Sequence, residues 1–468
     1  MAGDCEFSVT LWGAARSVTG SMHLVEACGR KILLDCGLVR GPHGHAHPPG
    51  PHFTFDPRDI DAVVISHAHI DHCGNLGMLI AQGFSGPIHA TPATCDLLRL
   101  VLRTSARIQE EDAFVRRVID SGSDREAQPP FTVDDVERGL AHAIAVPYQE
   151  PRQIAPGIQL LFADAGHILG SAMVSLTLEG SSRTARFTFT GDLGRKQPLL
   201  LRQPATVPAA DLVLCESTYG GRSVESAATA TAALYEIVRR TAEQGGKVLI
   251  PAFSLGRTQA VVDVLAQGVH EGLVPRIPIL VDGSLAAELA EVHRCHAACL
   301  DPAAAERLQR GDGILESAVV HYLKSPEESA EASRRREPCV ILAPSGMCEG
   351  GRIIRHLKEN LDDPRCSIVL VNYQAPHTLG RRLLQRGPKV RIHGRSWNKW
   401  AEVVALTGFS GHADHDDLLA ALSPLSADQP RIRLVHGEPE QAEALAAALM
   451  KVGFTDVAVP ERGERVPI

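Results

Sequence analysis

Short apolar segments bounded by polar or glycine-rich turns dominate the first part of the chain. Phe7–Leu11, Lys31–Leu34 and Ala62–Ile65 are rich in β-branched and other apolar residues, and each is predicted to be a strand. Two stretches without this pattern are expected to be loops: the His/Pro/Gly-rich stretch 41–52 and the stretch 121–130. The pattern therefore predicts a β-rich first unit.

From about Leu212 the pattern changes to strands that alternate with helices. The predicted strand Lys247–Phe253 is followed by Arg257–Leu273, which has the apolar spacing of a helix. The alternation continues through Pro278–Val281, Ser284–His296, Cys339–Ala343, Ile353–Leu361, Ile368–Val371 and Leu379–Arg386. Such alternation is typical of βαβ units with a mostly parallel sheet.

A second change of pattern, near Val403, divides the chain into three segments. A short predicted strand, Arg431–Val435, follows this point and ends at His436. We therefore expect one domain that is interrupted by another. The expected segments are 1–211 for the first part of the outer domain, 212–402 for the inserted domain, and 403–468 for the rest of the outer domain.

The most informative motif follows the predicted strand Ala62–Ile65 and reads His-Ala-His-Ile-Asp-His. On extended backbone, residues two apart project to the same side, so His67 and His69 can bind one ion. Asp71 and His72 follow at the turn into a helix and are predicted to face a second ion. Imidazole and carboxylate together suit Zn²⁺ and leave positions open for water. The alternative is a polar strand-to-helix turn with Asp71 as the N-cap.

Further acidic and imidazole side chains stand at or near the ends of predicted strands. Strand ends joined by loops are where a rigid scaffold presents ligands, although any one such residue is more often a cap or a satisfied polar group. The candidates are Asp35, His167, Asp192, Glu216 and His436. For Asp35, a role as a turn residue at a strand end stays open.

Composition narrows the class of protein. A chain of 468 residues, 44% apolar and 22% charged, fits a soluble globular protein of more than one domain. No stretch has the apolar length of a membrane span, and the acidic N-terminus is unlike a signal peptide. Eleven cysteines without a small-domain framework predict reduced thiols and a cytoplasmic location. The excess of 55 acidic over 47 basic residues argues against a general nucleic-acid coat but permits a local basic groove.

Together the motifs resemble the metallo-β-lactamase superfamily and, within it, the β-CASP nucleases. That family includes bacterial and archaeal ribonucleases and the nuclease subunit of the eukaryotic pre-mRNA cleavage machinery. The resemblance covers nearly the whole chain and rests on Asp35, the HxHxDH segment, His167, Asp192, Glu216, His412, His436 and the segments 251–259 and 344–347. It implies an α/β fold, in which a metallo-β-lactamase αββα sandwich carries an inserted β-CASP domain of mostly parallel sheet.

The resemblance also implies a role for each metal-binding side chain, with two Zn²⁺ per chain. One ion would be held by His67, His69 and His167, and the other by Asp71, His72 and His436, with Asp192 as the bridge. In the family the ions share a hydroxide of lowered pKa that attacks phosphorus, so Asp71 counts among the catalytic residues. Asp35 would orient the histidine loop.

The leaving ribose oxygen needs a proton. Glu216 and His412 resemble the family's pair for this step, in which a carboxylate orients an imidazole that donates near neutral pH. Ser410 stands beside His412, and Arg257 stands where a loop opens a helix. Both are predicted to contact a substrate phosphate.

The predicted substrate is single-stranded RNA, because RNA-processing relatives carry a histidine at the final motif, as this chain does at His436. Seven basic residues and no acidic residue lie between Leu379 and Lys399, near Trp397 and Trp400. This stretch is either a phosphate-facing patch with a stacking surface or a solvated helix face with core tryptophans.

The implied function is therefore a zinc-dependent ribonuclease of RNA processing or decay. Two alternatives stay open: a non-catalytic RNA-binding or scaffold member of the family, and a small-molecule metallohydrolase. No membrane partner is expected, a homodimer is left open, and the sequence does not separate endonuclease from 5′-exonuclease action.

Overall fold

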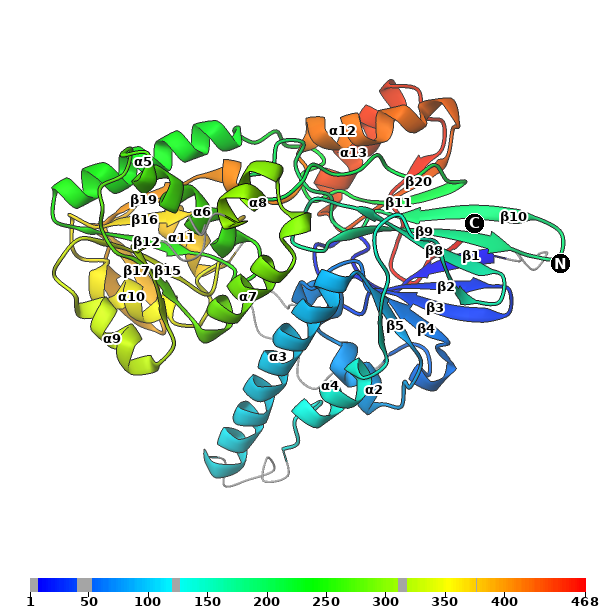
Figure 1. The fold of residues 1–468 in the computed structure, drawn as a ribbon, viewed down its shortest axis with the longest axis horizontal. Coiled ribbons are helices and arrows are strands. Elements are labelled where there is room, and N and C mark those ends of the chain that lie inside the picture. The colour runs from blue at the N-terminus through cyan, green and yellow to red at the C-terminus, as the bar shows by residue number, and fades with distance from the viewer. Residues whose placement is uncertain (1–6, 40–52, 120–126, 310–317, 376) are drawn as a thin grey trace.

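The structure, a computed structural model, describes residues 7–39, 53–119, 127–309, 318–375 and 377–468, which form two units side by side (Figure 1). The first and last parts of the chain build one unit, and the middle of the chain builds the other. The expected loop 41–52 lies outside the described residues, as does 121–126. None of the described helices combines the length and the apolar character that a membrane crossing needs.

Two seven-stranded sheets form the outer unit. The first has the spatial order β22 (Arg465–Pro467), β1 (Phe7–Leu11), β2 (His23–Ala27), β3 (Arg30–Leu34), β4 (Ala62–Val64), β5 (Ile88–Ala90) and β6 (Ala143–Ala145). The second has the order β21 (Val457–Ala458), β20 (Arg431–Val435), β11 (Leu212–Glu216), β10 (Thr184–Phe189), β9 (Ala172–Glu179), β8 (Ile158–Asp164) and β7 (Arg152–Ala155).

Alternating side chains along these strands serve two different cores. Leu212 and Leu214 of β11 pack between the two sheets, whereas Val213 and Cys215 face the helices outside. This period of two buries both faces of each sheet. One outer face is covered by α2 (Leu76–Ala81), α3 (Pro92–Ile119) and α4 (Val133–Leu140), and the other by α12 (His415–Leu422) and α13 (Pro439–Lys451). The result is the expected αββα sandwich.

The inserted unit is built on a six-stranded sheet in which every pairing is parallel. Its spatial order is β14 (Val320–Leu323), β13 (Ile279–Asp282), β15 (Cys339–Ala343), β12 (Lys247–Pro251), β16 (Ser367–Leu370) and β19 (Glu402–Ala405). The helices of this unit are α5 (Ala227–Glu243), α6 (Arg257–His270), α7 (Ser284–Cys295), α8 (Pro302–Gln309), α9 (Pro326–Arg334), α10 (Ile353–Asn360) and α11 (Leu379–Leu384).

Helices cover both faces of the parallel sheet, which explains why its strands read as unbroken apolar runs. Val248 and Ile250 of β12 belong to the core with α5 and α6, and Leu249 belongs to the core with α10. The α/β fold with an inserted, mostly parallel domain is thus confirmed.

The expected domain limits at 212 and 402 coincide with two strands, and each strand belongs to the unit on the other side of its limit. β11 begins at Leu212 but lies between β10 and β20 of the outer unit. β19 ends at Ala405 but pairs with β16 of the inserted sheet. Sheet membership therefore places both changes of unit a few residues later than the sequence pattern suggested, because strand pairing is decided by tertiary contacts.

Parallel pairing brings distant residues to one edge of the outer unit. β10 and β20 both run parallel to β11, so their carboxyl ends lie together. Asp192 follows β10, Glu216 ends β11, and His436 follows β20. This edge is where the candidate site residues meet.

Replacing Phe187 tests the packing between the two sheets. Its ring is fully buried in that core. We expect Phe187→Ala to lower the free energy of unfolding by about 3–5 kcal/mol, because it leaves a cavity that the sheets cannot close. Urea denaturation followed by circular dichroism measures the change. Phe114→Ala, at a ring that is 60% exposed on α3, is the matched control, and an equal effect of both would contradict the assignment.

Candidate metal centre

The HxHxDH motif lies where β4 ends and a short helix begins. The chain stays extended through His69, which is the N-cap of α1 (Ile70–Cys73). His67 and His69 therefore project from extended backbone, and Asp71 and His72 from the first helical turn. The predicted change of direction between the two pairs is present. The N-cap position belongs to His69, so the alternative with Asp71 as N-cap is wrong.

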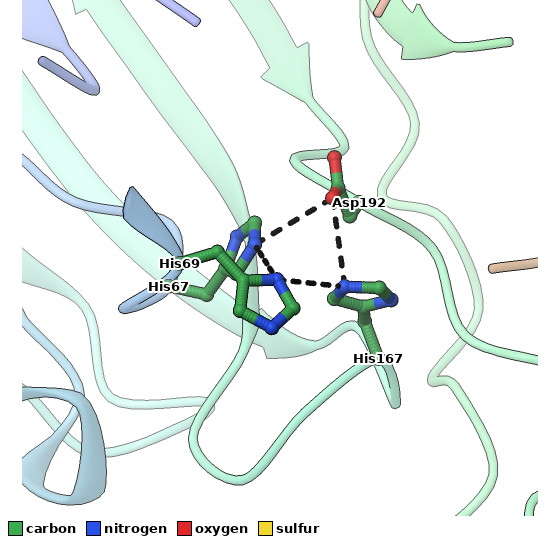
Figure 2. A group of neighbouring side chains, drawn as sticks. All are labelled: His67, His69, His167 and Asp192. Carbon is green, nitrogen blue, oxygen red and sulfur yellow. Dashed lines mark hydrogen bonds and ion pairs between the residues drawn. The ribbon is translucent and has the colours of Figure 1, made fainter. Parts of the chain in front are cut away.

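Figure 2 shows the first group of donors, made by His67, His69, His167 and Asp192. The Nδ1 of His69 is 3.2 Å from the Nε2 of His67 and 3.2 Å from the Nε2 of His167. The Oδ2 of Asp192 is 3.5 Å from both of these Nε2 atoms. In a tetrahedral zinc site with bonds of 2.0–2.1 Å, nitrogen atoms are about 3.3 Å apart. The spacing fits a zinc-sized ion.

Asp71, His72 and His436 form a second group. The Nε2 atoms of His72 and His436 are 3.2 Å apart, and the Nε2 of His436 is 3.7 Å from the Oδ2 of Asp71. The Oδ1 of Asp192 is 3.2 Å from the Nε2 of His72, is buried and makes no hydrogen bond within the described structure. Asp192 thus turns one oxygen toward each group, the arrangement that a bridging ligand requires.

Hydrogen bonds at the far ring nitrogens orient four of these histidines. A donor hydrogen held there leaves a lone pair on the nitrogen that faces the group. The acceptors are the Ser66 Oγ for His67 (3.1 Å), the Gly411 carbonyl for His167 (3.1 Å), the Asp35 carboxylate for His72 (2.6 Å) and the Thr218 Oγ1 for His436 (3.1 Å). Thr218 is fixed as an acceptor because its own hydroxyl donates to the His436 carbonyl at 2.9 Å.

Asp35 organises the loops that carry these ligands. Its buried carboxylate accepts from the His72 ring and from the hydroxyls of Ser21 (3.0 Å) and Ser66 (2.9 Å). It also accepts from the backbone N–H of Ser66 at 2.8 Å. The residue has a left-handed backbone with φ of 56°, a conformation that aspartate and asparagine tolerate better than most residues.

Burial sets the protonation of the first group. It lowers the pKa of His67 and His167 well below the ordinary value, with neighbouring imidazoles adding to the effect, and lowers the pKa of His69 to about 4. These rings are therefore neutral, which is the form that binds metal. Burial raises the pKa of Asp192, but the His436 and His72 side chains outweigh it and hold the pKa well below its usual range.

Glu216 and His412, which are 196 residues apart in the chain, lie beside the two groups. The Oε1 of Glu216 is 3.2 Å from the Nδ1 of His412 and accepts from the N–H of Leu193 at 2.7 Å. Burial lowers the pKa of His412, yet the Glu216 carboxylate more than offsets this and raises the pKa above the ordinary value. The Nδ1 of His412 is also 3.9 Å from Asp192, so its ring borders the metal centre.

A pocket between the two units adjoins the first group. Ser410 and Arg257 line it together with His69 and His167. Arg257 begins α6 and is half-buried, and its enclosed Nε has no hydrogen-bond partner within the described structure. Burial lowers the pKa of this guanidinium to about 10. A guanidinium with an unpartnered Nε–H beside a metal centre can bind a substrate phosphate.

Sequence reasoning missed the residues that orient the histidines. Ser66 directly precedes His67, and Thr218 lies two residues after Glu216, so both belong to segments that the motifs had already singled out. Their hydroxyls could have been suspected from this adjacency. The Gly411 carbonyl could not, because a backbone acceptor leaves no trace in the sequence.

Three domain models match the chain in succession. A beta-lactamase superfamily domain matches residues 30–251, a Beta-Casp domain matches 258–383, and a Zn-dependent metallo-hydrolase RNA specificity domain matches 400–460. These matches define a metal-dependent hydrolase of the metallo-β-lactamase type with a β-CASP insertion.

Relatives extend this result to the whole chain. A protein of Thermus thermophilus named Ribonuclease TTHA0252 is 38% identical over 98% of this chain and 99% of its own length. Transcription termination factor FttA of Methanocaldococcus jannaschii is 31% identical over 98% of this chain and 71% of its own length. The chain therefore belongs to the β-CASP family of the metallo-β-lactamase superfamily. A solved structure of a protein of unknown function from Enterococcus faecalis shares the fold, with a TM-score of 0.53, 14% identity, and coverage of 99% of this chain and 100% of that one.

Replacing Asp35 tests whether it holds the site together. Asp35→Asn keeps a residue that tolerates the left-handed backbone but removes the negative charge facing His72. We expect affinity for Zn²⁺, measured by competition with a chelator, to fall about 10–100-fold. Ser21→Ala, which removes one of the donors to Asp35, should have a smaller effect. Unchanged affinity in Asp35→Asn would show that the carboxylate does not support the site.

Proposed function

We propose that this chain is a ribonuclease that uses two Zn²⁺ ions to hydrolyse phosphodiester bonds of single-stranded RNA. The observation that carries the proposal is the position of Asp192, whose two carboxylate oxygens face two separate groups of donors. Paired metal sites of this kind serve in-line displacement at phosphorus.

The first ion is assigned to His67, His69 and His167, the second to Asp71, His72 and His436, and Asp192 to both. Imidazole nitrogen and carboxylate oxygen are the ligands that zinc takes in catalytic sites. When bound, the ions would stabilise charge on the phosphate and supply a water of lowered pKa as the nucleophile.

Glu216 and His412 are assigned to the leaving group. The contact of 3.2 Å to Glu216 holds the His412 ring and favours its protonated form. A protonated imidazole at the edge of the centre can donate its proton to the departing ribose oxygen. Ser410 and Arg257, in the adjoining pocket, are assigned to a phosphate of the bound strand.

The names of the relatives and the RNA specificity domain support RNA as the substrate. The pocket beside the centre is walled by both units, with Arg195 and Leu199 from one and Phe253 and Leu255 from the other. A pocket with walls from both units suits a single strand better than a duplex. We place the activity in the cytoplasm, where the free thiols of the described cysteines stay reduced. A homodimer remains a prediction.

The two alternatives are less well supported. A non-catalytic scaffold does not need a full set of ligands, and here each expected ligand lies in one of the two groups. A small-molecule metallohydrolase leaves the inserted unit without a role. Assays of labelled RNA, labelled single-stranded DNA and a generic lactam in parallel separate these functions, and hydrolysis of the lactam alone would overturn the proposal.

Replacing Asp71 tests the second ion. Among the described residues of the second group, Asp71 is the one carboxylate, and it is not shared with the first group. We expect Asp71→Ala to stay folded, to bind about one zinc ion per chain where the wild type binds two, and to lose RNA cleavage. Native mass spectrometry and a gel assay with labelled RNA give the two readouts. Full cleavage by the zinc-depleted variant would rule out the assignment.

Replacing His412 separates proton transfer from metal binding. We expect His412→Ala to lower kcat about 10²–10⁴-fold with unchanged zinc content, because it removes an acid and no ligand. His142→Ala, at an exposed histidine, is the control and should leave kcat unchanged. Loss of zinc from His412→Ala would instead make His412 a ligand, together with Asp192 and Glu216, which lie in one further cluster with it.

A further inference from the structure

The second half of the basic stretch near the end of the inserted unit forms a hairpin. Only Leu379–Leu384 is helical, and β17 (Lys389–Ile392) pairs with β18 (Arg395–Asn398), so the helix-face alternative for the whole stretch is wrong. His393 and Gly394 connect the strands, with φ of 47° and 77°. Positive φ at both turn residues is typical of a two-residue turn that matches strand twist.

The two faces of the hairpin carry different kinds of side chain. Val390 and Ile392 are buried in the core with α10, whereas Lys389 and Arg391 alternate with them and are exposed. Strand alternation therefore places both cations on the outer face. No acidic residue lies between Leu379 and Lys399, although the whole protein has a net charge of −8.

A hollow lies between the hairpin tip and α10. It has a volume of about 470 Å³ and is lined on its charged side by Arg352, Arg355, Lys358, His393 and one acid, Glu359. Arg352 is already engaged by Asp282 at 2.6 Å, and Arg355 donates to the Pro326 carbonyl at 2.8 Å. Lys358 reaches across to the turn, with its Nζ 3.3 Å from the Nδ1 of His393. Arg355 and Lys358 thus line the hollow next to the hairpin that exposes Lys389 and Arg391.

One loop links this face to the metal centre. The loop after β15 includes Gly346, whose Cα stands so close to Phe253 that an added Cβ would lie 3.2 Å from the Phe253 nitrogen. Phe253 lines the pocket beside His69 and His167. Further along the same loop, Gly350 and Gly351 line the hollow. A strand leaving the pocket over this loop would arrive at the cations.

We propose that Arg355, Lys358, Lys389 and Arg391 form a basic exosite that binds the phosphate backbone of RNA extending beyond the metal centre. The inference rests on the proposed function and deepens it. Separated ammonium and guanidinium groups on an open surface suit repeated phosphates and carry no base-reading geometry. The exosite therefore favours long strands over short ones, with no preference for sequence.

The test compares RNAs of two lengths with two sets of substitutions. The exosite set is Lys358→Gln, Lys389→Gln and Arg391→Gln. The control set removes the same charge from three exposed arginines of α3, as Arg107→Gln, Arg116→Gln and Arg117→Gln. Binding of labelled RNA is followed by fluorescence anisotropy in a His412→Ala background, which keeps the strand intact. Cleavage is measured in parallel with His412 present.

For RNA of about 30 nucleotides, we expect the exosite set to raise Kd on the order of tenfold and to reduce the slope of log K against log salt by about 2, since each single-strand phosphate contact contributes about 0.7. For RNA of about 6 nucleotides, a length within the reach of one single-strand site, kcat/KM should not change. The control set should leave both RNAs unaffected.

The exosite would be overturned by unchanged affinity for the long RNA, by an equal loss with the control set, or by an equal loss of kcat/KM for the short RNA. Polyglutamate serves as a probe for an acidic protein partner. If the exosite set lost binding to polyglutamate while RNA binding stayed intact, the exosite would be overturned in favour of such a partner. If the wild type binds long RNA through these cations but cleaves none, the proposed function fails while the exosite stands.

Discussion

Asp192 holds each carboxylate oxygen against a different set of imidazole nitrogens, at 3.2–3.5 Å, in a fully enclosed position. A buried carboxylate is tolerated only where it is paired with opposite charge, hydrogen-bonded or bound to a metal. The imidazoles that would share a metal with Asp192 lie after β4, in the loop after β8 and after β20, so the site requires both sheets and both ends of the outer unit. The two-layer sandwich provides the rigid edge on which they converge.

Much of this fold follows from patterns that the chain shows locally. Unbroken apolar strands alternating with helices indicated the parallel sheet of the inserted unit, because both faces of that sheet are covered. The limits of the units did not follow, since the sequences of β11 and β19 do not show which of the two sheets each strand joins. The β17–β18 hairpin was not predicted because its turn has a weak sequence signal. The turn, His393-Gly394, carries only one glycine and lacks the asparagine or aspartate that usually marks such a turn.

The candidate site, too, could be predicted from the sequence only in part. His67, His69, Asp71 and His72 lie within six residues, so strand and helix geometry alone separated them into two groups. Pairing Glu216 with His412 required a family resemblance, because no spacing rule connects residues so far apart. The hydroxyl and carbonyl groups that set ring orientation form a further layer. Serines, threonines and backbone acceptors are too common for their presence to signal a role.

The order of strands in the second sheet has a consequence for biosynthesis. β20 joins β11 as its direct neighbour although more than two hundred residues separate them, and His436 follows β20. Ribosomes deliver the amino-terminal donors first, so a nascent or prematurely terminated polypeptide lacks this last imidazole. Each copy of the chain would thus acquire its complete set of metal-binding side chains only after this late segment has been made.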